Sequence, residues 1–139
     1  YAWKLYYEMQ IPIVLQWKKY FGDLETWHIW GIVAVSQNSS NSLQHINRNY
    51  SDYISDHLLD REKGLNAMTI SDITGIPRAT VVRKLKILVK NKFLVFNKKK
   101  LYFPSNFHQK DISNLVTISI KSVSVFSTKI YNQLIFNKN

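Results

Sequence analysis

The sequence predicts a mainly helical fold of the α+β class with one small β-hairpin. Three observations lead to this prediction. Apolar residues recur at three- and four-residue spacing over most of the chain, as they do on one face of a helix. Glycines such as Gly22 and Gly75 separate these stretches where helices are expected to end. Two short strand-like runs, residues 93–96 and 101–103, flank the polar residues 97–100.

The composition indicates one globular, intracellular domain. The chain has 139 residues, and a hydrophobic content of 45% is enough for a core. It contains no cysteine, which excludes disulfide bonds, thiol catalysis and zinc–cysteine sites. We find no signal peptide and no uncharged apolar run of about 18 residues, so we expect a cytoplasmic protein without membrane association. We expect a single domain, 1–139, with N-terminal helices and a loop in 1–47, a core in 48–104 and a C-terminal helix in 105–139.

Two helices are predicted at the N-terminus. Aromatic and apolar residues at helical spacing indicate a helix over residues 1–21, which Pro12 is expected to break, kink or restart. Gly22 and Asp23 mark a turn. Asp23 suits the N-cap of a second helix through residues 24–35.

A loop and a third helix follow. Residues 36–49 are rich in Ser, Asn and Gln, which is typical of a loop. Apolar residues at helical spacing predict a helix over residues 50–63. Gly64 suits its C-terminal cap.

The middle of the chain predicts two helices joined by a tight turn. Thr69 and Asp72 resemble a capping box, so a short helix is expected over residues 69–74. Pro77 suits the first turn of the next helix, 77–91, because its missing N–H has no partner to lose there. Three apolar residues fall at i, i+4 and i+7 and are expected to face the core: Val81, Leu85 and Leu88.

The C-terminal segment predicts one long helix. Apolar residues between positions 111 and 136 lie near helical spacing. Many of them are β-branched, which lowers helix propensity. An extended conformation over residues 116–125 therefore stays open as an alternative.

Positive charge is concentrated around the two central helices. The net charge is +10, and residues 61–103 hold eleven basic and two acidic side chains, a net charge of +9. Residues 1–60 hold four basic and six acidic side chains, a net charge of −2. This distribution is expected of a surface that binds nucleic-acid phosphates. The alternative is a solvated lysine-rich surface.

The outer face of helix 77–91 holds candidate base contacts. Arg78 and Arg83 are long enough for bidentate hydrogen bonds to guanine in the major groove. Ala79 and Val82 are suited to a thymine methyl group. Thr80 and the free amides at the start of the helix are suited to phosphate.

Lysines further along are candidate backbone contacts. Lys86 and Lys90 follow on the same outer face of the helix. Lys98, Lys99 and Lys100 lie at the expected hairpin tip, where they would reach a flanking phosphate or a minor groove. For each lysine, simple solvation is the alternative.

The order helix, turn, helix, hairpin resembles the winged helix-turn-helix transcription regulators of bacteria and archaea, over about residues 50–104. The resemblance implies sequence-specific binding of double-stranded DNA and regulation of transcription, with the recognition helix in the major groove. The residues that carry it are Ile73, Gly75, Ile76, Pro77, Thr80, Val81, Arg83, Leu85, Leu88, Phe93 and Leu94.

The size, the flanking helices and the long tail resemble the MarR-like regulators in particular. Those proteins are dimers whose terminal helices form the interface, so the resemblance implies a homodimer. Their Asp-x-Arg wing pattern is replaced here by Lys98, Lys99 and Lys100. Which small-molecule effector acts on the protein, if one does, is left open.

No enzymatic, cofactor or metal chemistry is expected. The four histidines, His28, His45, His57 and His108, lack ligand spacing. His57 near Asp56 and Asp60 could hold a metal ion, but these residues are more simply a solvated acidic helix face. Phosphate-loop, nucleophile-elbow and dinucleotide motifs are absent.

The aromatic N-terminal third leaves three alternatives open. Its residues could line an effector pocket, although core or dimer interface is the simpler interpretation: Trp3, Tyr6, Tyr7, Trp17, Tyr20, Trp27 and Trp30. A second hypothesis is a winged-helix assembly, replication or partition module with only non-specific DNA affinity. A third is peripheral membrane attachment through the aromatic N-terminus and the basic surface.

Overall fold

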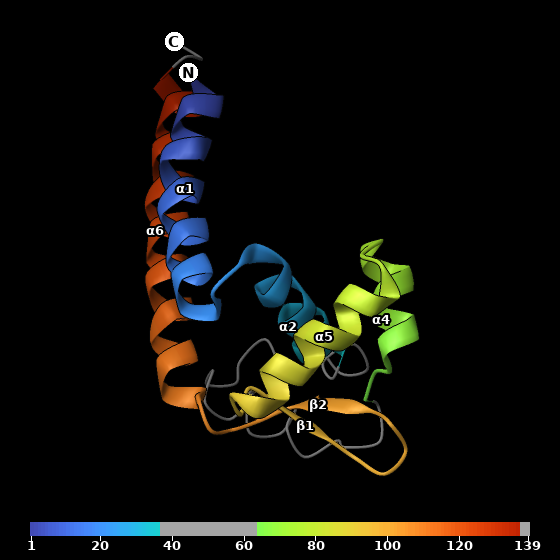
Figure 1. The fold of residues 1–139 in the computed structure, drawn as a ribbon. Coiled ribbons are helices and arrows are strands. Elements are labelled where there is room, and N and C mark those ends of the chain that lie inside the picture. The colour runs from blue at the N-terminus through green and yellow to red at the C-terminus, as the bar shows by residue number, and fades with distance from the viewer. Residues whose placement is uncertain (37–63, 137–139) are drawn as a thin grey trace. The chain divides into compact units, whose positions relative to one another are not determined.

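The computed structural model describes residues 1–36 and 64–136, which form five helices and one two-stranded antiparallel sheet. The elements are α1 (Ala2–Phe21), α2 (Leu24–Ser36), α4 (Ala67–Thr74), α5 (Arg78–Lys90), β1 (Leu94–Phe96), β2 (Tyr102–Pro104) and α6 (Gln109–Phe136) (Figure 1). The predicted mainly helical class with one β-hairpin is confirmed. The loop predicted at 36–49, apart from Ser36, and the helix predicted at 50–63 lie outside the described residues, as do His45 and His57.

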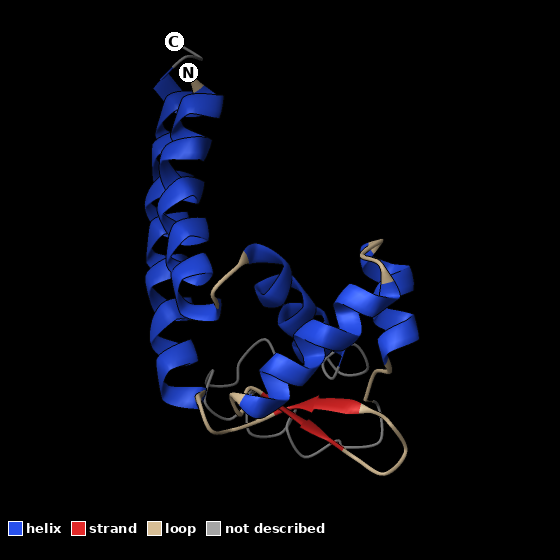
Figure 2. Cartoon of the chain, viewed as in Figure 1, coloured by secondary structure: helices blue, strands red, loops and turns tan. Residues whose placement is uncertain are grey.

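The chain divides into two compact units. The terminal unit joins the two ends of the chain, Tyr1–Leu24 and Gln109–Asn139. The central unit is Glu25–His108. The predicted helix-turn-helix and the β-hairpin both belong to the central unit, while the long C-terminal helix belongs to the terminal unit (Figure 2).

In the terminal unit, α1 and α6 lie side by side and run in opposite directions (Figure 1). The Trp17 indole N–H donates to the Ser119 hydroxyl oxygen at 3.1 Å, which ties the two helices together near the middle of α6. Among the described residues of this unit, four side chains form its buried apolar core: Leu5, Trp17, Phe21 and Ile112. The core is therefore small for two helices of 20 and 28 residues.

Helix α1 runs through Pro12 without interruption, so two of the three effects predicted for Pro12, a break and a new helix start, are wrong. A proline inside a helix removes one hydrogen bond, here the one that the Glu8 carbonyl would accept. Packing on α6 compensates, since Leu5 and Trp17 on either side of Pro12 are both buried. The helix ends where predicted, at Gly22, whose φ of 92° lies in the left-handed region.

Helix α6 is continuous, which confirms the prediction of one long helix and excludes the extended alternative at 116–125. Packing on α1 outweighs the low propensity of its β-branched residues. The hydroxyls of Thr117, Ser119 and Ser122 each donate to the carbonyl four residues earlier, so they are satisfied within the helix.

The central unit has a dense apolar core. Seven of its side chains are almost completely buried and come from α2, α4, α5 and β1: Ile29, Val33, Ile70, Val81, Leu85, Leu88 and Leu94. The three residues predicted to face inward from the second central helix are among them. The outward direction of the opposite face of α5 follows from this burial.

The turn between α4 and α5 agrees with the prediction, but the cap of α4 does not. The Asn66 side-chain oxygen accepts from the Thr69 backbone N–H at 2.9 Å, so Asn66 is the N-cap and the helix begins at Ala67. The capping box expected at Thr69 is wrong because Thr69 already lies in the first turn. Gly75 ends α4 with a φ of 71°, and Pro77 directly precedes α5.

The β-hairpin pairs Val95 with Phe103 and closes over a turn at residues 97–101. The Asn97 side-chain oxygen accepts from the Leu101 N–H at 3.0 Å and fixes this turn. Leu65, just before α4, forms an isolated antiparallel bridge to Tyr102 on the outer side of β2. This bridge joins the hairpin to the start of α4. Because it involves a single residue, no pattern in the sequence predicts it.

Candidate nucleic-acid interface

The solvent face of α5 carries the predicted base contacts. Arg78, Ala79 and Arg83 are exposed, while Thr80 and Val82 are half-buried. Because the opposite face is fixed in the core by its buried apolar residues, the outer face is held in one orientation. A 13-residue helix is about 20 Å long, enough to lie along the floor of a groove.

The predicted backbone contacts are exposed as well. Lys86 and Lys90 lie on the same side of α5 as Arg83. At the tip of the β-hairpin, the side chains of Lys98, Lys99 and Lys100 are all exposed. The central unit thus presents its basic side chains from two elements, the helix and the hairpin.

One basic residue of α5 departs from this pattern. Lys84 is 5% exposed and faces inward, against the start of α2. Its ammonium lies 3.3 Å from Glu25 Oε2 and donates to the Thr26 hydroxyl at 3.4 Å. Helix α5 contains five basic residues, of which four are exposed and the fifth, Lys84, is part of the core.

The start of α5 is a second feature suited to anions. The first amides of a helix have no partner within the helix, and the helix dipole adds partial positive charge there. Pro77 provides no side-chain cap, and no acidic residue occupies the first turn. A phosphate beside Arg78 and Ala79 would meet these amides directly.

Positive charge dominates the described part of the central unit. Its residues 25–36 and 64–108 include nine Lys and Arg against two acids, Glu25 and Asp72. One of these acids, Glu25, pairs with the buried Lys84. Within the described ranges no ion pair engages the outward-facing Arg and Lys of α5 or those of the hairpin tip, so their charge is available to a partner.

A cluster at the end of α5 connects the helix to the hairpin, and sequence reasoning missed it. His108 Nε2 lies 2.8 Å from the Asn91 carbonyl oxygen, and its ring stacks on Phe93 with centroids 4.0 Å apart. Lys92 has a φ of 62° and places its ammonium 4.5 Å from the ring centre of Phe107. These contacts position β1 relative to α5. Asn91 and His108 are 17 residues apart, a separation that matches neither a helical nor a strand period. Little in the sequence therefore indicates this contact.

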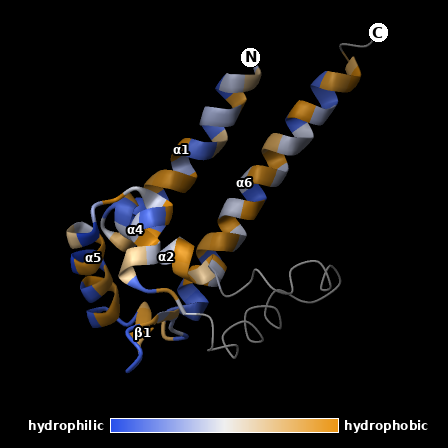
Figure 3. Ribbon diagram, turned by 90° about the vertical axis from the view of Figure 1, so that its right-hand side faces the viewer, coloured by the Kyte–Doolittle hydropathy of each residue, from blue (hydrophilic) through white to orange (hydrophobic). Residues whose placement is uncertain are grey.

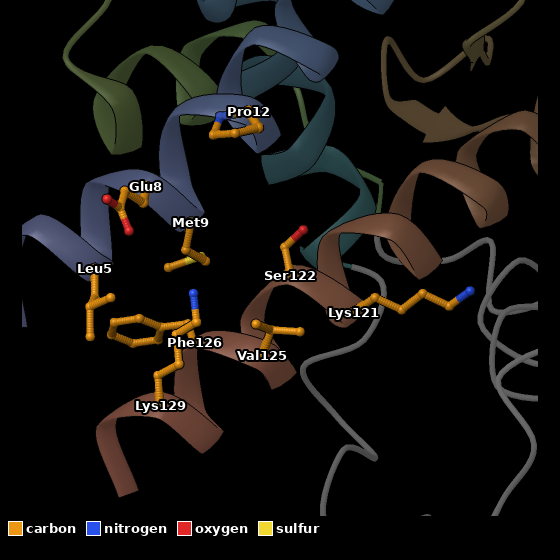
Figure 4. A pocket seen from close by; sticks show the side chains of 9 residues that line it. All are labelled: Leu5, Glu8, Met9, Pro12, Lys121, Ser122, Val125, Phe126 and Lys129. Carbon is orange, nitrogen blue, oxygen red and sulfur yellow. The ribbon is translucent and has the colours of Figure 1, made fainter. Parts of the chain in front are cut away.

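The terminal unit contains an open groove of about 300 Å³ between α1 and α6. It is lined by Leu5, Glu8, Met9 and Pro12 from α1 and by Lys121, Ser122, Val125, Phe126 and Lys129 from α6 (Figure 4). The Lys129 side chain reaches over the apolar floor, while that of Lys121 extends away from it (Figure 4). The aromatic residues considered from the sequence as an effector pocket do not line this groove.

Residues of high hydropathy recur along α1 and α6 of the terminal unit (Figure 3). Both helices also expose long stripes of apolar side chains. Along α1, Trp3, Tyr7 and Ile11 follow each other at four-residue spacing, and Trp3 is 71% exposed. Along α6 the exposed stripe consists of Ile120, Val123, Tyr131 and Leu134. None of these seven residues lines the groove.

Other classes of site are not found within residues 1–36 and 64–136. These residues contain no group of three His, Cys, Asp or Glu side chains that could hold a metal ion. No helix among them is long and apolar enough to cross a membrane. No family model, curated protein or solved structure matches the chain.

Proposed function

We propose that the central unit is a winged helix-turn-helix that binds double-stranded DNA sequence-specifically and regulates transcription. Helix α5 would enter the major groove, and the β1–β2 hairpin would contact the flanking backbone or minor groove. One observation carries this proposal: α5 buries its apolar face completely while Arg83, Lys86 and Lys90 occupy the opposite face and Arg78 is exposed at the start of the helix, none of them in an ion pair with a described residue.

The two ends of α5 would have different roles. Arg78 and Arg83, near its start, would donate to base edges, where the guanine O6 and N7 atoms accept a bidentate guanidinium. Ala79 and Val82 lie beside them and would meet thymine methyl groups. Thr80 and the first amides of the helix would bind a phosphate.

The lysines would supply the sequence-independent part of the affinity. Lys86 and Lys90 lie further along the helix, and Lys98, Lys99 and Lys100 lie at the hairpin tip. Each phosphate they neutralise releases a counterion, so affinity should fall with salt at a slope of about −0.9 per contact.

We also propose that the protein is a homodimer that pairs through the exposed stripes of the terminal unit. The seven stripe residues, three of them aromatic and each at least 45% exposed, offer an apolar surface on the order of several hundred Å². A stable interface buries about 800 Å² per partner. Two terminal units would form a four-helix bundle and present two copies of α5 to successive turns of DNA, as in a cytoplasmic MarR-like regulator.

Fluorescence-anisotropy titration of random and selected duplexes across a salt series tests DNA binding. The wild-type protein should bind one selected sequence about a thousandfold tighter than random duplex. The double variant Arg83→Ala and Lys86→Ala should lose this preference while staying folded. Lys18→Ala with Lys19→Ala removes the same charge from the terminal unit and serves as the matched control. If the first double variant keeps wild-type affinity, α5 is not the reading helix.

A second candidate is an assembly, replication or partition module with only non-specific DNA affinity. The exposed apolar stripes of α1 and α6 favour it, because such a surface suits a protein partner. This candidate predicts weak binding of equal strength to every duplex in the same titration. It also predicts that a different protein, and not a second copy of the chain, occupies the stripes.

A further inference from the structure

The buried Lys84 is unusual for its place on α5. It lies three residues after Val81 and four before Leu88, both completely buried, so it occupies a position on the inward face of the helix. An apolar side chain would be expected there. An ammonium on this face loses hydration, a cost that must be offset by polar partners.

The partners come from the first turn of α2. Glu25 Oε2 lies 3.3 Å from the Lys84 ammonium, and the Thr26 hydroxyl oxygen lies 3.4 Å from it. Thr26 is 3% exposed, whereas the Glu25 side chain is 56% exposed. The ammonium therefore reaches from the core to its rim, with one buried and one solvated acceptor.

Stability alone does not account for this arrangement. Replacing a buried ion pair with apolar residues of similar volume is often neutral or stabilising. A longer apolar surface on α5 would also bury more area against α2. An apolar contact is not directional, so it tolerates small rotations and shifts of a helix. A hydrogen-bonded ammonium, by contrast, requires a particular distance and angle.

We propose that Lys84 is a positioning residue that fixes the rotation and axial register of α5 against the first turn of α2. Its neighbour Arg83 lies on the outer face, so the orientation of Arg83 depends on the same rotation. Bidentate contacts to base edges require placement within about 0.5 Å. Lys84 would thus control sequence discrimination without touching DNA, an inference that rests on the proposed function.

The test compares the wild-type protein with Lys84→Met, Lys84→Arg and Glu25→Gln in the anisotropy titration. Methionine keeps the length and apolar stem of the side chain and removes the charge. For Lys84→Met we expect unchanged affinity for random duplex, an unchanged salt slope and at least about tenfold weaker binding of the selected duplex. Lys84→Arg should restore most of the discrimination. Glu25→Gln should reduce it in the same direction, although Glu25 lies outside α5.

The outcomes separate this inference from simpler roles and from the proposed function itself. If Lys84→Met lowers both affinities together and makes the salt slope shallower, Lys84 contacts a phosphate and the inference is wrong. Unchanged discrimination in Lys84→Met also overturns it. Should Lys84→Met fail to fold, Glu25→Gln decides, because its exposed side chain can be changed without opening the core. If the wild-type protein itself does not discriminate between duplexes, the proposed function fails first, before any variant is compared.

Discussion

The central and terminal units differ in how completely they bury their apolar side chains. In the central unit, residues from four elements close a core in which seven side chains are almost inaccessible. In the terminal unit, two longer helices bury only four apolar side chains among the described residues and leave thirteen large ones exposed, seven of them in the stripes. Two helices have too few faces to enclose a core, which supports the proposal that a second copy of the chain covers the stripes.

This difference suggests that the two units have different functions. A unit with a closed core holds its surface groups rigidly, which base readout requires. A unit with an open apolar face is suited to association, which two-fold DNA recognition requires. The charges agree with this division, since nine of the described basic residues lie in the central unit and its solvent face on α5 has no acidic residue.

The largest expected effect tests whether the core of the central unit is complete without a partner. Leu85→Ala should lower the free energy of unfolding by about 2–5 kcal/mol, because a completely buried leucine leaves a cavity. Ile87, two residues later on the same helix, is exposed, and Ile87→Ala should change the stability by no more than about 0.5 kcal/mol. Urea denaturation measures both. Equal losses would mean that a partner covers Ile87 and that the core does not close within this unit.

The second prediction tests the open face of the terminal unit. Leu134 is 63% exposed, and Leu134→Lys should weaken self-association by about a hundredfold, because an unpaired ammonium would be buried in the interface. Thr128, exposed on α6 but outside the stripe, provides the matched control Thr128→Lys. Sedimentation equilibrium measures both variants. A monomeric wild-type protein, or equal effects of the two variants, would contradict the proposed dimer.

The third prediction tests packing density at two positions within the central unit. A methyl group added at Gly64 would lie 2.5 Å from Cζ of Phe103, a buried ring in the central unit. Gly64→Ala should therefore cost about 1–3 kcal/mol of stability through overpacking. Gly31 lies in α2 with nothing within 4 Å of such a methyl group, so Gly31→Ala should stabilise the helix by up to about 1 kcal/mol. Thermal unfolding that moved the same way in both variants would contradict this account of Gly64.

The sequence was sufficient to predict the elements that depend on residues close together in the chain. The period of Val81, Leu85 and Leu88 predicted α5 to within one residue at either end and identified its buried face. The residues between the two strand-like runs predicted the hairpin turn. The apolar period at the C-terminus predicted α6 in spite of its β-branched residues, because helical packing outweighs propensity.

The features that sequence reasoning missed depend on partners far away in the chain. Nothing near Lys84 in the sequence indicates that its ammonium pairs with Glu25 and donates a hydrogen bond to Thr26. Pro12 was expected to break, kink or restart the first helix, and the sequence does not show that packing on α6 keeps α1 continuous there. The contacts of His108 with Asn91 and Phe93 likewise join residues with no common period. Whether the exposed face of α5 reads DNA stays a prediction.

The smallest expected effect lies at the junction of α1 and α6. Burial, together with the charge of the Asp111 carboxylate and its hydrogen bond from the phenol at 3.4 Å, raises the pKa of Tyr20 to about 12. The folded protein therefore holds this proton more tightly than the unfolded chain, in which the pKa is near 10. Its contribution to stability is complete below pH 10 and is lost as the pH rises toward 12.

Tyr20→Phe should remove this part of the pH dependence, so the difference in stability between wild-type protein and variant should shrink between pH 10 and 12. The difference in phenolate absorbance between the two proteins should titrate with a midpoint near 12. Because Tyr20 is partly solvated, the change in stability should be small. A midpoint near 10 would mean that the phenol and Asp111 are apart in solution, and that this contact does not hold α1 and α6 together.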